Sequence, residues 1–238
     1  MTMCRSSPLR ILCLTLLLAA ALHAAEWGSS WPDHLWRGSA AGLNNPHLLF
    51  AAGAIAGLSA WDRDIRMAEP KLLPDALARF GKYYGFGTNY AAGSLFILTD
   101  GLGGWPTSRS ERLDNWQTFS ESYAVNMAAT AALKLVTRRL RPDGSGRDSF
   151  PSGHTSASAC VAAHLNRRYG AAAGLPAAAA ALIAGASRLQ HQRHWFSDVL
   201  AGALLGGLIG DGFGQLERTS GRSSPAAMRW QFDLILIF

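Results

Sequence analysis

The sequence predicts an all-α protein, a helical bundle of about six core helices. Apolar segments rich in Ala, Leu and Gly recur along the chain, and alternating runs of β-branched residues are nearly absent. Polar, charged or Gly- and Pro-rich stretches separate these segments, as loops separate helices. The expected helices cover residues 47–61, 86–99, 121–137, 155–169, 171–187 and 199–213.

Residues 1–25 have the pattern of a signal peptide. Arg5 and Arg10 give a positive start, residues 11–22 form an apolar run, and small residues follow at Ala24 and Ala25. The apolar run is shorter than the roughly 20 residues that a membrane span needs, which favours cleavage over an uncleaved anchor helix.

Three regions follow the expected cleavage site. Residues 26–46 are rich in Trp, Gly and Pro and are expected to be irregular, and residues 47–220 form the helical domain. In the tail, 221–238, apolar side chains take every second position from Trp230 to Phe238, which predicts a short strand that packs on the domain. The pattern resembles the last strand of an outer-membrane barrel, but one strand cannot make a barrel.

The charge balance favours an anionic partner. The chain has 22 Lys and Arg against 16 Asp and Glu, a net charge of +6. Phosphate groups or acidic lipids suit this balance. Nucleic acid is not expected, because no binding motif or concentrated basic tail accompanies the charge. After cleavage Cys160 is the single cysteine, so we expect no intramolecular disulfide and a buried side chain.

The relation to a membrane stays open. Each apolar run is shorter than the roughly 20 residues of a span, and basic residues populate the loops on both sides. After cleavage the chain would start outside the membrane. If the first three helices then crossed it, the loop after residue 137 would face the cytoplasm, whereas an exported protein would more naturally face outward. These points favour a soluble or peripherally attached bundle over an integral membrane protein.

The first polar cluster is "KLVTRRLRP", residues 134–142. Lys134 and Arg141 are seven residues apart, so a helix would place both on one face with Arg138 between them, and Pro142 would end the helix. Arg139 is expected either to steer an anionic substrate or to be solvated. Alone, the cluster is explained as a solvated basic face.

The second cluster is "PSGH", in which Pro151 suits the first turn of a helix. Unpaired backbone N–H groups at Ser152 and Gly153 would make an anion site, and glycine lets a ligand come close to the main chain. His154 would face the same pocket. Alone, it is explained as a capping histidine.

The third cluster is "SRLQHQRHWFSD", residues 187–198. His194 and Asp198 are four apart and can meet on one helical turn, where a carboxylate fixes the tautomer of an imidazole. Arg188 offers a planar, two-pronged grip for phosphate oxygens. Alone, the pair is explained as a surface salt bridge. His191 is expected to be structural. A metal site is not expected, because no HExxH pattern accompanies the histidines.

Together the three clusters resemble the signature of the type-2 phosphatidic-acid phosphatase superfamily. That signature reads K-x6-RP, then PSGH, then SR-x5-H-x3-D, and every position is present in order within residues 121–213. The superfamily includes membrane lipid phosphatases, soluble class A acid phosphatases and vanadium-dependent haloperoxidases, all with a helical-bundle core.

The resemblance implies a role for each matched residue. His194 would attack phosphorus and form a phosphohistidine, Asp198 would hold its tautomer, and His154 would protonate the departing alkoxide and then activate water. No metal or other cofactor is implied. The phosphate-binding groups would be the side chains of Lys134, Arg141 and Arg188 and the backbone N–H groups of Ser152 and Gly153.

The expected function is therefore an exported, metal-independent phosphatase that hydrolyses phosphate monoesters or diphosphates. The substrate would be a lipid phosphate or a small phosphate ester, at the periplasmic side of the cell envelope, with the enzyme soluble or membrane-associated. Two alternatives stay open: a haloperoxidase that holds vanadate on His194, and a non-catalytic envelope binding protein. The sequence does not indicate an oligomeric state.

Overall fold

The computed structural model of the chain describes residues 31–44, 48–68, 71–99 and 108–216. These residues contain helices and no strand, which confirms the all-α prediction. The expected signal peptide and the expected C-terminal strand lie outside the described residues. The helices are α2 (Trp31–Leu43), α3 (Leu48–Leu58), α4 (Asp62–Ala68), α5 (Asp75–Tyr83), α6 (Asn89–Leu98), α8 (Arg109–Thr137), α9 (Gly153–Tyr169), α10 (Ala171–Gln190) and α11 (Phe196–Gly214), with a 3-10 turn at Ser59–Trp61 and a π turn at Tyr84–Thr88.

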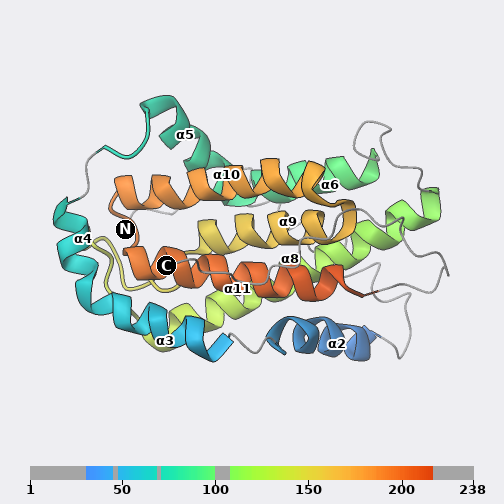
Figure 1. Cartoon of the computed structure of the whole chain (residues 1–238), viewed down its shortest axis with the longest axis horizontal. Helices are drawn as coiled ribbons and strands as arrows, with labels where there is room; N and C mark the ends of the chain where they lie inside the picture. Colours follow the sequence, from blue (N-terminus) through green and yellow to red (C-terminus); the bar gives the residue numbers. More distant parts are fainter. Residues whose placement is uncertain (1–30, 45–47, 69–70, 100–107, 217–238) are drawn as a thin grey trace, which may run out of the picture.

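Four long helices, α8 to α11, run along the long axis of the molecule (Figure 1). Helix α9 is central and packs against α8, α10 and α11. Successive long helices run in opposite directions, so α8 and α10 end where α9 and α11 begin. One end of the bundle, at the left in Figure 1, therefore collects the connections 138–152 and 191–195. We call it the loop end.

The core around α9 is built from aromatic rings and small side chains. The rings of Tyr90 and Phe119 stack with centroids 5.4 Å apart, and Phe119 meets the buried His164 edge-on at 5.3 Å. Cys160 is fully buried in α9, as expected. Aromatic pairs of this kind add stability beyond the apolar area that they bury.

Glycines let α11 lie directly on the backbone of α9. A Cβ atom on Gly202, Gly206 or Gly210, one turn apart, would lie 2.5, 2.0 or 2.3 Å from a carbonyl oxygen of α9 or its cap. The oxygens belong to Ser152, Ser156 and Cys160. Small residues at this spacing allow helix backbones to approach closely. The contact brings the start of α9 against the start of α11.

The N-terminal region differs from the expectation of irregular structure, because residues 31–43 form helix α2. Pro32 stands in its first turn, where a missing N–H costs nothing. Gly38 packs on the ring of Phe213, and Gly42 packs on the carbonyl of Leu208. Close packing on α11 thus supports a helix that the Trp-, Gly- and Pro-rich composition does not favour.

Helix α8 begins earlier than the expected range 121–137 and ends where that range ends, short of the Arg141 that the first polar cluster was expected to place on it. It begins with a capping box in which the Ser108 side chain accepts from the Glu111 N–H, and it ends at Thr137. Arg138 follows in a left-handed conformation with φ 46°. Arg138 and Arg141 therefore do not lie on the helix face of Lys134 as predicted, and Pro142 does not end the helix.

Two helices are longer than their apolar runs suggested. Helices α10 and α11 have 20 and 19 residues, long and apolar enough to cross a membrane. In each, half of the most apolar 18-residue window is buried inside the bundle. The expectation that each apolar run is too short to cross a membrane is therefore wrong for α10 and α11.

Candidate active site

The residues singled out by their spacing meet at the loop end of the bundle. Lys134 comes from the last turn of α8, His154 from the first turn of α9 and Arg188 from the last turn of α10. His194 lies in the turn before α11. The charges of Lys134 and Arg141 act on both histidines. The antiparallel order of the four long helices thus brings three distant segments to one place.

The start of α9 differs from the prediction at Ser152. Ser152 is the N-cap, and its N–H donates to the carbonyl of Asp198 at 2.9 Å. This N–H is therefore not free to bind phosphate, contrary to our expectation. Gly153 adjoins the cations instead, since a Cβ atom there would lie 3.8 Å from Cε of Lys134. Pro151 precedes the cap and is not part of the first turn.

Two arginines present hydrogen-bond donors that no protein group uses. Nη2 of Arg188 and Nε of Arg141 are buried and have no partner among the described residues. Arg141 Nη2 donates to the Asp148 carboxylate at 2.7 Å, and Arg188 Nε donates to Ser187 Oγ at 3.2 Å. Buried donors are nearly always satisfied, so these two predict an anionic ligand.

Lys134 completes the cationic set. Its Nζ donates to the backbone carbonyl of Asp148 at 2.5 Å, and that residue also pairs with Arg141. Asp148 therefore holds both cations in place at one side of the site. A phosphoryl group could draw on Lys134, Arg141 and Arg188 together.

His194 is held by a backbone carbonyl rather than by the predicted carboxylate. Its Nδ1 lies 2.7 Å from the oxygen of Ser149, while the Asp198 carboxylate is 3.9 Å away. The carbonyl accepts a hydrogen bond, so Nδ1 carries the proton and Nε2 keeps its lone pair. The expected meeting on one helical turn fails because His194 precedes α11 and is not part of it.

Both histidines are neutral at neutral pH in the free site. Burial lowers the pKa of His194 to about 2, with the charge of Lys134 adding to the effect. Burial, and then the charge of Arg188, lower the pKa of His154 to about 3. His154 Nε2 lies 3.5 Å from Nη1 of Arg188, and the ring also bonds the backbone of Lys82. A bound phosphate dianion would favour protonation of either ring.

Two residues near the site, Ser149 and Asp62, were not found from the sequence, and neither was the role of a third, Arg139. Ser149 carries the carbonyl that orients His194, and the buried Asp62 forms an ion pair with Arg139 at 2.6 Å. Arg139 is not solvated as we had considered, since it also pairs with Asp198 at 2.6 Å. Its neighbour Arg138 and the preceding lysine drew attention to the segment, but no pattern in the sequence marks Asp62.

The remaining polar residues near the signature bond to other parts of the fold, and for His191 a structural role was expected. His191 Nδ1 lies 2.6 Å from the carbonyl of Ser187, and Ser156 donates to Asn126 at 2.7 Å. Ser158 is buried and bonds Asn89. Across the part of the chain that the structure describes, no three His, Cys, Asp or Glu side chains gather as metal ligands do.

Comparison with known proteins adds independent information. Residues 116–219 match the model of the PAP2 superfamily. Over 107 residues the chain is 36% identical to a lipid A 1-phosphatase from Porphyromonas gingivalis (strain ATCC 33277), a match over 42% of this chain and 24% of that protein. The chain thus spans about a quarter of the length of this relative. A crystal structure of a transmembrane PAP2-type phosphatidylglycerolphosphate phosphatase from Bacillus subtilis aligns with TM-score 0.46 and 22% identity, over 76% of this chain and 90% of that one.

Proposed function

We propose that this chain, whose residues 116–219 match the model of the PAP2 superfamily, is an exported lipid-phosphate phosphatase that works through a phosphohistidine on His194. One observation carries the proposal. Two unpartnered guanidinium donors and Lys134 surround the place that His154 and His194 share. Three cations beside a histidine with a free Nε2 suit in-line transfer of a phosphoryl group.

The first half-reaction transfers the phosphoryl group to the protein. The Nε2 lone pair of His194 attacks phosphorus as the bond to the leaving oxygen breaks. His154, protonated when the phosphate dianion binds, gives its proton to that oxygen. Lys134, Arg141 and Arg188, with the N–H of Gly153, hold the three non-bridging oxygens while their charge redistributes.

The second half-reaction releases phosphate. His154, now neutral, takes a proton from a water molecule whose oxygen attacks phosphorus, and the bond from phosphorus to Nε2 of His194 breaks. The proton taken from water restores the protonated His154, which loses it again as the phosphate leaves the site. No step needs a metal ion or another cofactor, because side-chain cations supply the charge stabilisation.

A lipid phosphate is favoured over a small ester by the surface beside the cations. A hollow of about 580 Å³ is lined by Lys134, Leu135, Arg138, Arg147 and Asp148. Next to it, Leu135 and Val136 are 72% and 81% exposed. Apolar side chains directly beside a phosphate-binding lysine suit an amphiphilic substrate, and the lipid A 1-phosphatase relative is named for one.

Phosphate release from a detergent-dispersed lipid phosphate and from an aryl phosphate, in excess chelator, tests the proposal. The His194→Ala variant should lose all activity and remain folded, because the nucleophile is gone. The His191→Ala variant is the matched control, since the ring of His191 bonds a backbone carbonyl, and it should keep its activity.

The possible results separate the alternatives. Turnover that survives in His194→Ala would overturn the phosphohistidine mechanism. A folded wild-type protein that releases no phosphate from either substrate would overturn the phosphatase and leave vanadate chemistry or a binding role. A preference for the aryl phosphate would count against the lipid substrate.

A further inference from the structure

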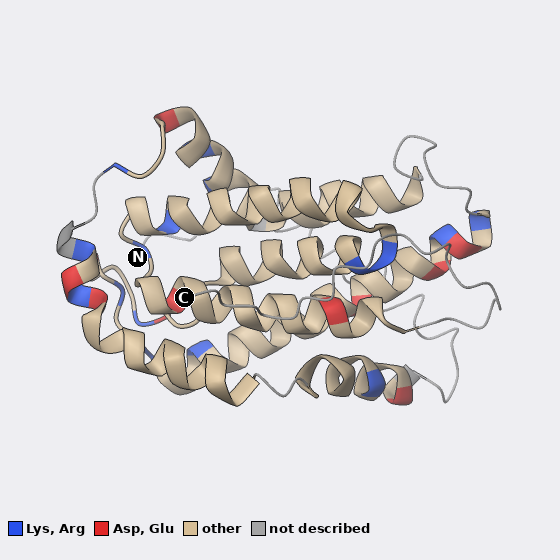
Figure 2. Cartoon of the chain, viewed as in Figure 1, with Lys and Arg blue, Asp and Glu red and all other residues tan. Residues whose placement is uncertain are grey.

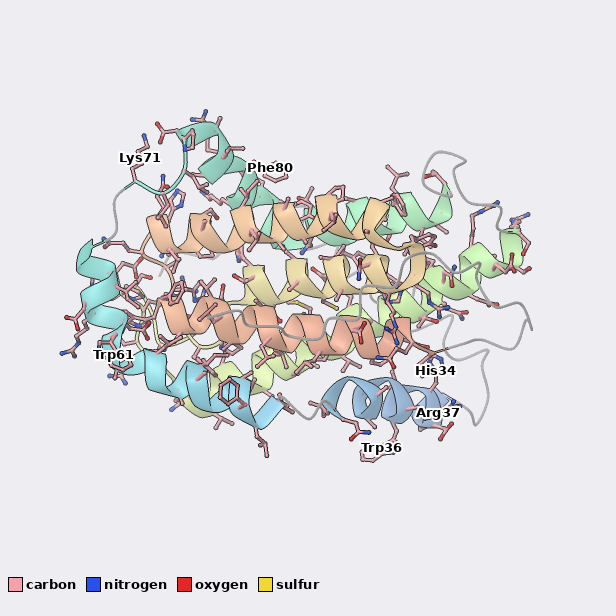
Figure 3. All side chains as sticks on the ribbon, viewed as in Figure 1. His34, Trp36, Arg37, Trp61, Lys71 and Phe80 are labelled. Carbon is pink, nitrogen blue, oxygen red and sulfur yellow. The ribbon has the colours of Figure 1, made fainter. Side chains whose placement is uncertain are left out.

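A buried carboxylate reaches the loop end from outside the segment that matches the family model. Asp62, at the start of α4, is 3% exposed. Its oxygens accept from the Ser197 N–H at 3.0 Å, the Ser197 hydroxyl at 2.5 Å and Arg139 Nη2 at 2.6 Å. Trp61, the residue before it, is labelled at the left end of the molecule in Figure 3.

Arg139 links the Asp62 carboxylate to the carboxylate of Asp198, the last residue of the signature. Its Nη1 donates to Asp198 Oδ1 at 2.6 Å and to Ser197 Oγ at 2.7 Å, and its Nη2 donates to Asp62. The guanidinium also lies over the ring of Trp195, 5.6 Å from its centroid. The planar fork of arginine suits such two-sided pairing, which a lysine could not reproduce.

The contacts continue from Asp198 to His194 through Ser149. Asp198 Oδ2 accepts from the Ser149 hydroxyl at 2.5 Å and from the Trp195 N–H at 2.9 Å. The Ser149 N–H donates to the Arg139 carbonyl at 3.0 Å, and the Ser149 carbonyl accepts from His194. Ser149 is therefore held on two sides while it orients the nucleophile.

We propose that Asp62 and Arg139 act together as positioning residues, which aim His194 through Asp198 and Ser149. This role rests on the proposed function, in which His194 is the nucleophile. Neither residue has a contact with Lys134, Arg141 or Arg188 among the hydrogen bonds and ion pairs of the described residues. The pair therefore acts on the nucleophile and leaves phosphate binding alone.

Helix α4 supports the same turn from its outer side. The guanidinium of Arg66 lies over the Trp195 ring, 5.8 Å from its centroid, and donates to the Gln192 side chain at 3.2 Å. Helix α4 thus contacts the turn 191–195 through Arg66 and the start of α11, at Ser197, through Asp62. A segment far away in sequence fixes the position of the nucleophile.

Steady-state kinetics of Arg139→Met, Asp62→Asn and the double variant test this inference. Misplacing a reacting atom by about 1 Å costs on the order of 100-fold, so kcat should fall by roughly that factor in Arg139→Met and by less in Asp62→Asn. The KM for an aryl phosphate and the inhibition constant of orthophosphate should stay unchanged, because the phosphate-binding cations are intact. Residues that act as a unit are not additive, so the double variant should be no slower than Arg139→Met.

Arg167→Met is the matched control. It removes another partly buried arginine, in the last turn of α9 and away from the loop end, that faces a carboxylate, Asp211 at 3.8 Å. It should leave kcat unchanged. A similar loss of kcat in this variant would show that any lost ion pair disturbs the bundle, and would overturn the specific role of Asp62 and Arg139.

Other results would also overturn the inference. These are an unchanged kcat in Arg139→Met, a loss of orthophosphate inhibition in parallel with kcat, or effects of the two substitutions that multiply. If Arg139→Met does not fold, Asp62→Asn carries the same test, since the amide preserves size. An inactive wild-type protein would overturn the proposed function itself, whereas an active wild type beside equally active variants would overturn the positioning role alone.

Discussion

At the scale of single residues, Gly85 controls the space available to His154. A Cβ atom on Gly85 would lie 2.7 Å from both Cβ and Cδ2 of His154. We predict that Gly85→Ala displaces the imidazole and impairs proton transfer to the leaving group. General acid catalysis is worth about 100- to 10,000-fold, so turnover of an alkyl or lipid phosphate should fall by at least roughly 10-fold. An aryl phosphate with a good leaving group, which needs less protonation, should be affected less.

The control for this variant is Gly57→Ala, in α3, because nothing lies within 4 Å of a Cβ atom there. It should match the wild type on both substrates. An equal loss on aryl and alkyl phosphates in Gly85→Ala would contradict the prediction, since it would show damage to nucleophilic attack or phosphate binding.

The sequence identified the residues that meet at the loop end better than the residues that hold them. Spacing was sufficient to select Lys134, His154 and His194, because each is tied to a helix end that packing then brings together. It could not select Ser149, whose backbone carbonyl orients His194, because the path of a loop follows no period. Asp62 lies 135 residues from its partner Ser197, and a single sequence does not show contacts over such distances.

At the scale of helices, the glycine contact between α9 and α11 sets the geometry of the site. We predict that Gly206→Ala destabilises the protein, because the added methyl would lie 2.0 Å from the Ser156 carbonyl oxygen and the backbones must separate. Overpacking costs about 1–3 kcal/mol in a well-packed core. Thermal unfolding in detergent would show this as a lower Tm.

Its neighbour provides the control. Gly207 has nothing within 4 Å of a Cβ atom, and alanine is the better helix former by about 1 kcal/mol. Gly207→Ala should therefore keep or raise the Tm. If both variants shift the Tm alike, the close contact of α11 with α9 is not what stabilises the bundle.

The apolar cores of the helices could be predicted, but their polar ends could not. The expected range 121–137 leaves out the N-terminal part of α8, where buried polar side chains are hydrogen-bonded. Thr118 donates to the Asp114 carbonyl at 3.0 Å and Ser120 bonds the hydroxyl of Tyr90 at 2.8 Å, while Glu121, the first residue of the expected range, bonds His34 at 2.6 Å. A prediction from apolar periodicity misses a helix whose buried side chains are polar and hydrogen-bonded within the protein. The same limit explains why α2, which supplies His34, was not expected.

At the scale of the whole molecule, the charges gather at the two ends of the bundle. Figure 2 shows Lys, Arg, Asp and Glu on α4, α5 and the loop end, and again where α8 begins and α9 and α11 end. Between these ends the long helices carry almost no charge. Large apolar side chains are exposed in this zone, Leu49 of α3 at 85% and Leu182 of α10 at 75%. A zone with almost no charge and with exposed leucines suits a lipid environment, and the candidate active site at the loop end lies at the border of this zone.

We predict from this zone that the protein is embedded in a membrane through its middle, and that Leu182→Arg weakens the attachment. Leu182 lies near the centre of α10, where an arginine facing hydrocarbon costs about 2.5–3.5 kcal/mol. Flotation with liposomes, or resistance to alkaline extraction, measures the attached fraction, which should fall in the variant.

Leu72→Arg is the control, because Leu72 is 40% exposed beside Lys71, where charges are already solvated. Equal attachment of both variants would contradict an embedded α10, and a wild type that stays with the aqueous phase would favour a soluble bundle. The outcome also bears on the reaction, because a site at the border of the lipid zone would meet the phosphate of a lipid without drawing its chains into water.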